Sequence, residues 1–107
     1  MAETLSIRGF QIHKGFLDRA GQEEIVQALR TIAQEAPFFA PETARGRKMS
    51  VRMTSAGRVG WVTDRRGYRY EPRHPEGMGW PAIPEGILDI WRALVGEARL
   101  PDSCLVN

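Results

Sequence analysis

Residues 48–70 read KMSVRMTSAGRVGWVTDRRGYRY, and this stretch decides the fold that we expect for the chain. In its first part, Met49, Val51 and Met53 alternate with polar residues. Such alternation is typical of a half-buried strand, because successive side chains of a strand point to opposite sides. We therefore predict a strand here, with Met49 and Val51 on its buried side.

Two turn signals divide the rest of this stretch. Residues 55–57 (Ser-Ala-Gly) predict a turn that ends the first strand, and residues 65–67 (Arg-Arg-Gly) predict a second turn. Trp61 precedes the second turn, and Tyr68 and Tyr70 follow it with the alternation of a strand. The pattern favours an antiparallel β-hairpin or a short meander over the whole stretch.

The N-terminal part predicts one strand followed by one helix. Residues 5–12 alternate in polarity, and Gly9 shifts the phase as a β-bulge would. Asp18 is an expected N-cap, and Pro37 ends a stretch whose apolar residues recur at helical spacing. These apolar residues are Ile25, Ala28, Leu29, Ile32 and Ala36. We expect them to form the buried face of an amphipathic helix.

The remaining residues predict loops, a second helix and a last strand. Residues 37–46 lack periodicity and residues 71–84 contain four prolines, so both segments are expected to be irregular. Pro84 can open a second helix. Its predicted apolar face consists of Ile87, Ile90, Trp91 and Leu94. With a strand at residues 104–106, the pattern predicts an α+β fold of two helices and antiparallel hairpin strands.

The composition fits one modest soluble domain. The chain has 107 residues, of which 42% are hydrophobic and 26% are charged. It contains no apolar run of the roughly 20 residues that a membrane-spanning helix needs, and no signal-peptide pattern at the N-terminus. We therefore expect a cytoplasmic protein without a membrane partner. Cys104 is the only cysteine, which excludes an internal disulfide.

Positive charge is concentrated in the middle of the chain. Residues 44–73 carry nine basic and two acidic side chains, although the net charge of the whole chain is only +2. Eight of the nine basic residues are arginines, whose planar group suits phosphate geometry and stacks on bases. This basic block favours contact with a polyanion, and the alternative is the solvated surface of a β-hairpin.

The sequence contains no self-contained catalytic or metal-binding motif. His13 and His74 have no histidine or carboxylate at the spacing of a metal site, so we expect two surface histidines. Cys104 lies in an apolar strand, where a thiol usually behaves as a small buried hydrophobe.

Aromatic residues inside the basic block are the strongest indication of function. Trp61, Tyr68 and Tyr70 lie among the eight arginines. Aromatic rings stack on unpaired bases and guanidinium groups hold phosphates, so the combination is typical of a site for single-stranded or extruded nucleotides. The alternative is that Trp61 packs in the core, as large aromatic side chains commonly do.

Four segments of the chain resemble the N-terminal part of the bacterial AlkB family. They are residues 48–61 (KMSVRMTSAGRVGW), 67–70 (GYRY), 79–84 (GWPAIP) and 104–107 (CLVN), in this order. AlkB proteins are Fe(II) and 2-oxoglutarate dependent dioxygenases that repair alkylation damage by oxidatively dealkylating DNA and RNA bases. The resemblance implies a single N-terminal AlkB-like region over residues 1–107. It would comprise the nucleotide-recognition lid, at about 44–73, and the first strands of an incomplete double-stranded β-helix (jelly roll).

The resemblance also implies roles for individual residues. Trp61 matches the tryptophan that stacks on the damaged base, and Met53 matches a methionine of the same pocket. Tyr68 matches a tyrosine that contacts the nucleotide phosphate, Tyr70 lies just beyond it, and Thr43 falls at a lid threonine near the backbone of the bound strand. The implied partner is a nucleic acid with a single-stranded or extruded alkylated base, and no protein partner is implied.

The cofactor residues are only partly matched. Asn107 matches the asparagine that begins the Asn-x-Tyr stretch, which binds 2-oxoglutarate in the family. The iron ligands of the family, a His-x-Asp and a distal His, fall beyond Asn107. We therefore expect the chain to capture bases for the intact enzyme, to bind neither Fe(II) nor 2-oxoglutarate tightly, and to be catalytically silent alone. The alternative is a stand-alone basic module that binds single-stranded nucleic acid without chemistry.

Overall fold

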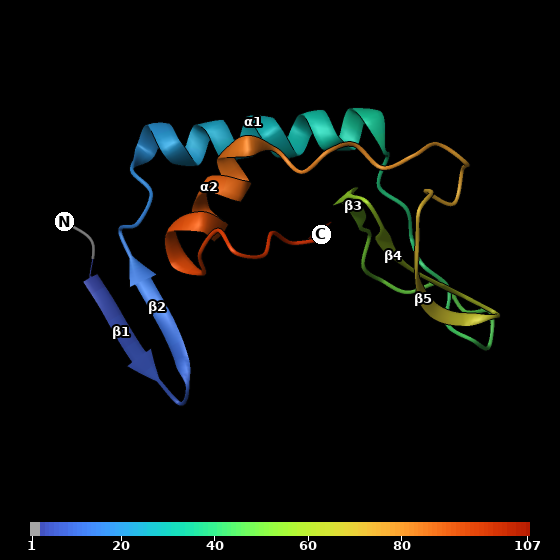
Figure 1. Ribbon diagram of the computed structural model, residues 1–107. Helices are drawn as coiled ribbons and strands as arrows, with labels where there is room; N and C mark the ends of the chain where they lie inside the picture. Colours follow the sequence, from blue (N-terminus) through green and yellow to red (C-terminus); the bar gives the residue numbers. More distant parts are fainter. Residues whose placement is uncertain (1–2) are drawn as a thin grey trace.

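The computed structural model describes residues 3–107, which form two helices and six strands (Figure 1). The strands are β1 (Glu3–Ile7), β2 (Phe10–Lys14), β3 (Thr54–Gly57), β4 (Gly60–Asp64), β5 (Gly67–Glu71) and β6 (Ser103–Val106). They pair as three two-stranded antiparallel sheets, β1–β2, β3–β6 and β4–β5. The helices are α1 (Arg19–Glu35) and α2 (Glu85–Leu94). The predicted α+β class is confirmed.

Helix α1 lies along one side of the molecule, and the other elements lie beside it or at its two ends (Figure 1). The Asp18 carboxylate accepts a hydrogen bond from the backbone N–H of Gly21 at 2.8 Å, so the predicted N-cap is confirmed. The β1–β2 hairpin stands at the N-terminal end of α1, and β3, β4 and β5 lie towards its C-terminal end (Figure 1). Ile32 and Ala36 are buried, and Ile25, Ala28 and Leu29 are half-buried, so the predicted apolar face is confirmed and is buried most deeply at its C-terminal end.

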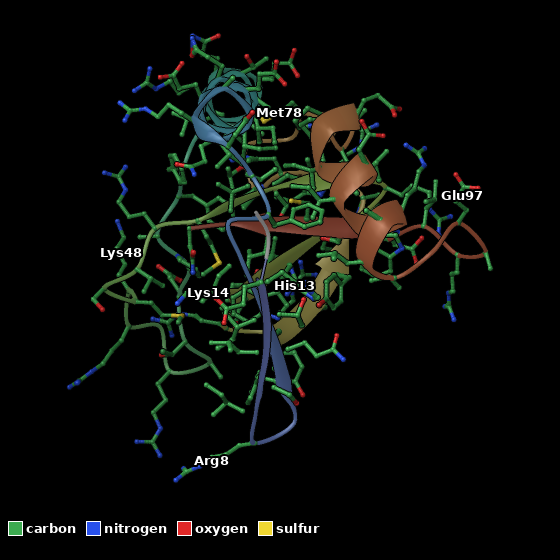
Figure 2. All side chains as sticks on the ribbon, turned by 90° about the vertical axis from the view of Figure 1, so that its left-hand side faces the viewer. Arg8, His13, Lys14, Lys48, Met78 and Glu97 are labelled. Carbon is green, nitrogen blue, oxygen red and sulfur yellow. The ribbon has the colours of Figure 1, made fainter. Side chains whose placement is uncertain are left out.

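The N-terminal strand is in fact a hairpin. Ile7 lies opposite Phe10, and the two residues between them, Arg8 and Gly9, have positive φ angles of 50° and 85°. Positive φ at both central residues is typical of a type I′ turn, so the predicted bulge at Gly9 is wrong. A bulge and a tight turn shift the polarity pattern in the same way, which is why the pattern did not separate them. Figure 2 shows Arg8 at the outer tip of this hairpin.

The strand predicted at the start of the basic block is displaced along the chain. The residues before Thr54 are mostly irregular, and the Val51 side chain is 41% exposed rather than buried. Residues 55–57, predicted as a turn, lie in β3, where Ser55 stands opposite Leu105 of β6. Ala56 is fully buried in one core cluster with Ile32 and Val106. The pairing with a strand near the other end of the chain, which local patterns do not reveal, makes these residues a strand.

The β4–β5 hairpin confirms the second predicted turn. Asp64 and Gly67 close it, and the buried Val62 packs in a second core cluster with Ala36 and Trp80. Because β3 pairs with β6 and not with β4, the meander alternative is wrong. The Trp80 ring lies against Gly60, and a Cβ atom there would overlap it. The predicted irregular segment at residues 71–84 thus supplies a core side chain.

Helix α2 follows this segment as predicted and contacts α1. Ile87, Ile90 and Trp91 are half-buried, but Leu94 at the end of the helix is 42% exposed and does not join the predicted apolar face. No helix within residues 3–107 is both long and apolar enough to cross a bilayer.

Candidate functional site

One face of the β4–β5 hairpin is aromatic. Trp61 lies directly opposite Tyr70, and Thr63 lies opposite Tyr68. Side chains two residues apart in a strand point to the same side, so Trp61, Tyr68 and Tyr70 share one face. Tyr68 is 77% and Tyr70 62% exposed, which means that this face holds accessible rings rather than core rings.

A cavity of about 400 Å³ lies where this aromatic face meets the β3–β6 sheet. It is lined by Met53, Trp61, Tyr70, Ser103 and Leu105, and we call it the aromatic cavity. Met53 is buried and Trp61 is half-buried. The structure therefore brings together three of the residues predicted for substrate binding. The two β6 residues were missed, and their only signal was the alternation that places them on the same side of their strand.

The other three predicted site residues lie outside the cavity wall. Tyr68 is its neighbour on the aromatic face. Asn107 is exposed and follows β6 directly, where strand alternation places it on the side of Leu105. Thr43 holds a turn, because its hydroxyl accepts a hydrogen bond from the backbone N–H of Arg47 at 3.2 Å. That turn lies beside β4, since the N–H of Glu42 donates to the carbonyl of Thr63 at 3.2 Å.

The opposite face of the hairpin carries a closed ion-pair network. The Arg69 guanidinium donates to both carboxylate oxygens of Asp64, each at 2.9 Å, and to Glu71 at 2.5 Å. The hydrogen bonds from Arg69, and then one from the backbone of Arg66, lower the pKa of Asp64 to about 2. The same pairing raises the pKa of Arg69. Arg69 is therefore a structural residue of the hairpin rather than a free phosphate contact.

The Asp64 network predicts a distinct response to acid. Because the folded chain lowers the pKa of Asp64 from 3.8 to about 2, its stabilising effect is complete above the unfolded pKa and is lost as pH falls through the folded pKa. Urea unfolding at pH 4 and at pH 2 should show a smaller loss of stability for Asp64→Asn than for the wild type. An equal loss in both proteins would show that Asp64 gains nothing from Arg69.

A larger cavity of about 550 Å³ lies against the ion-pair face. Its lining includes Asp64, Arg69, Glu71 and the buried His74. Arg69 is paired with both carboxylates, and the histidine is fully hydrogen-bonded. We therefore place the candidate site at the aromatic cavity, where no lining residue has its polar atoms committed to an ion pair.

The basic block divides into paired and unpaired cations. Arg58 pairs with Asp102, Arg69 pairs as described, and Arg73 donates to the carbonyl of Gly77 at 3.0 Å. Among residues 3–107, the remaining cations of the block have no carboxylate partner. They are Arg45, Arg47, Lys48, Arg52, Arg65 and Arg66. Figure 2 shows Lys48 and Glu97 on opposite sides of the molecule. The cations available to a polyanion are thus a subset of the block.

The histidines and the cysteine form no metal site. His74 is only 2% exposed, so its prediction as a surface residue is wrong. Its Nε2 donates to the Pro37 carbonyl at 2.8 Å and its Nδ1 accepts from the N–H of Glu76 at 3.0 Å, so the ring is a satisfied core group. Cys104 is half-buried, and burial raises the pKa of its thiol. Within the described residues, no three His, Cys, Asp or Glu side chains gather to hold a metal ion.

Comparison with known proteins identifies the family. Residues 9–107 match the 2OG-Fe(II) oxygenase superfamily. The chain is 47% identical over 102 residues to the "Alpha-ketoglutarate-dependent dioxygenase AlkB homolog" of Caulobacter vibrioides, covering 94% of this chain and 46% of the relative. It is 34% identical over 90 residues to the "Alpha-ketoglutarate-dependent dioxygenase AlkB" of Escherichia coli strain K12, covering 79% of this chain and 42% of the relative.

The Salmonella typhimurium protein of the same name is 36% identical over 104 residues, which cover 92% of this chain and 48% of the relative. The chain thus spans about half the length of the relatives that it matches. The matches extend over nearly the whole chain, including the segments that build the aromatic cavity. On this basis, the chain belongs to the 2OG-Fe(II) oxygenase superfamily and, within it, to the AlkB family.

Proposed function

We propose that this chain forms the substrate-capture part of an AlkB-like dioxygenase that oxidatively dealkylates nucleic-acid bases. The observation that carries this proposal is the aromatic cavity, which joins Trp61, Tyr70 and Met53 in one wall. In the intact enzyme, Fe(II) and 2-oxoglutarate would activate the dioxygen that oxidises the substrate, with 2-oxoglutarate oxidised alongside it. The described residues do not provide an iron donor set, so the role that we assign to them is capture of the base.

In this proposal, a base is held in the aromatic cavity by stacking on aromatic side chains. Taking a base out of a duplex costs a few kcal/mol, and least where pairing is already lost. A base that enters the cavity meets the faces or edges of Trp61 and Tyr70 and the apolar side chains of Met53 and Leu105. Stacking on an aromatic ring contributes about 1–3 kcal/mol per base, which offsets much of that cost.

The neighbouring residues complete the proposed lid at residues 44–73. Tyr68 presents its ring on the same face as the cavity wall, where its hydroxyl can donate to a phosphate. Thr43 holds the turn that carries Arg45 and Arg47 beside the hairpin, close to the path of the strand backbone. We assign Asn107 to the binding of 2-oxoglutarate. We assign β3 and β6 to the first strands of a jelly roll, in which further strands would pair with their open edges.

A binding comparison tests this proposal. The 107-residue chain is titrated with fluorescent single-stranded DNA that carries one N-methylated base, and with the unmodified DNA of the same sequence. We expect several-fold tighter binding of the methylated strand, because methylation of a ring nitrogen gives the base a positive charge, and a cationic ring is attracted more strongly to the faces of Trp61 and Tyr70. Equal affinity for the two strands would overturn the proposal and favour the basic module without base recognition.

The unpaired cations predict the salt dependence of this binding. For single strands, log K falls by about 0.7 per phosphate contact for each unit of log salt. Replacing Arg47 by glutamine should weaken binding and make this slope shallower by about 0.7. Arg19→Gln is the matched control, because Arg19 lies in α1 and pairs with Glu23. An unchanged slope in Arg47→Gln would remove Arg47 from the phosphate contacts, and a wild-type affinity insensitive to salt would exclude them altogether.

A further inference from the structure

An apolar groove with one cation is formed in part by Arg52, the chain neighbour of the cavity residue Met53. It measures about 450 Å³ and is lined by Ala33, Pro37, Phe38 and Arg52. The Phe38 side chain is 39% exposed and takes no part in either core cluster. An aromatic ring that contributes little to the core and remains open to solvent is available to a ligand.

The backbone joins this groove firmly to the cavity wall. Phe39 and Met53 form an isolated bridge, in which each backbone N–H donates to the carbonyl of the other at 2.9 Å. Phe38 and Arg52 are the direct chain neighbours of these two residues. Because successive side chains of an extended chain point to opposite sides, Phe38 and Arg52 face away from the Met53 side chain, and the groove lies on the other face of this bridge. A strand whose base occupies the cavity would reach this groove around the edge of the bridge, with nucleotides that flank the captured one.

The positive charge around the groove favours a nucleic acid as the ligand. Arg52 has no carboxylate partner within residues 3–107, and residues 44–52 carry four cations and no acidic residue. A ring beside an unpaired guanidinium offers stacking to a base and a charge-assisted hydrogen bond to its phosphate. A protein partner would need its own acidic side chains here, whereas a nucleic acid brings phosphates with every base.

We propose that Phe38 and Arg52 form a second nucleotide site, which binds an unpaired base flanking the captured one. The base stacks on Phe38, and Arg52 holds the adjoining phosphate. This site rests on the proposed function, and it extends the contact from a single base to a length of single strand. It predicts that affinity increases with strand length beyond what the cavity alone provides.

Probes of two lengths distinguish binding at the second site from binding in the aromatic cavity. The wild-type chain and its variants are titrated with two probes, a nine-nucleotide single strand with one central N-methylated base and the mononucleotide of that base. Phe38→Ala should weaken binding of the long probe by about 5- to 150-fold and leave the mononucleotide affinity unchanged. Phe38→Tyr keeps the ring and should retain the affinity. Phe16→Ala removes a phenylalanine of similar exposure, 38%, near the N-terminal hairpin, and should change neither affinity.

Two further variants separate the possible failures. Arg52→Gln should weaken only the long probe and make its salt dependence shallower, even if Phe38→Ala were to disturb the fold. Trp61→Ala should weaken both probes. If Trp61→Ala has this effect while Phe38→Ala and Arg52→Gln leave the long probe unchanged, the second site is wrong and the proposed function stands. If the wild type does not prefer the methylated strand over the unmodified one, the proposed function fails and the second site with it.

Discussion

Replacing Trp61 by alanine should weaken binding of a methylated single strand by about 5- to 150-fold, with little change in the melting temperature. The fold-change corresponds to the loss of about 1–3 kcal/mol of stacking per base. Little stability should be lost, because Trp61 is half-buried and lines the aromatic cavity instead of belonging to either core cluster. Fluorescence anisotropy measures the first effect, and thermal unfolding followed by circular dichroism measures the second.

The residue next to Trp61 provides the control for this experiment. Val62 is buried on the opposite face of the same strand, where it packs with Ala36 and Trp80. Val62→Ala should therefore lower the melting temperature and leave the affinity of the folded chain nearly unchanged. A Trp61→Ala variant that unfolds as readily as Val62→Ala would place the tryptophan in the core and remove the stacking role.

The elements that local sequence predicts well are those whose determinants lie within a few residues. The Asp18 cap, the helical spacing up to Ala36 and Pro37 define α1 without help from the rest of the chain. The turn before Gly67 is equally local, because Gly67 takes a φ of 93° that other residues rarely adopt. Both predictions are confirmed.

The elements that were placed wrongly depend on distant partners. Ser55 and Ala56 resemble turn residues in sequence, yet they are fully buried because β6 pairs with β3 along its whole length. His74 resembles a surface residue in a Pro-rich loop, yet the Pro37 carbonyl and the N–H of Glu76 satisfy its ring in the interior. Strand pairing and hydrogen bonding between distant segments of the chain are tertiary effects, and they override the structure that the local sequence favours.

The candidate site also combines residues that local sequence predicts with residues that only distant strand pairing brings to it. The aromatic residues of the β4–β5 hairpin were found from their own strand pattern and from the AlkB resemblance. Ser103 and Leu105 became part of the cavity only through the pairing of β6 with β3. The residue types suggested that the whole basic block is one surface for a polyanion. Arg58 is paired with Asp102, however, and Arg69 with Asp64 and Glu71, so these two arginines are not available to it. The individual roles of all the predicted site residues stay predictions: Met53, Trp61, Tyr68, Tyr70, Thr43 and Asn107.

Replacing Trp80 by alanine should have the largest effect on stability, a loss of about 3–5 kcal/mol of unfolding free energy. Trp80 is only 8% exposed and packs with Ala36 and Val62. Its indole N–H donates to the Glu71 carbonyl at 2.8 Å, so truncation also leaves that carbonyl without its partner. The ring further covers Gly60, the first residue of β4. The side chain therefore anchors both strands of the hairpin that carries the aromatic face.

Urea unfolding measures this loss, and Tyr68→Ala serves as the control, since Tyr68 is 77% exposed and its removal should change stability by less than about 0.5 kcal/mol. Gly60→Ala should act like Trp80→Ala, because the added methyl group overlaps the indole ring. If Trp80→Ala proves as stable as Tyr68→Ala, the second core cluster does not hold the hairpin. The fixed position of Trp61 and Tyr70, which stacking on a base requires, would then depend on the contacts of β4 with β3 and β6 rather than on Trp80.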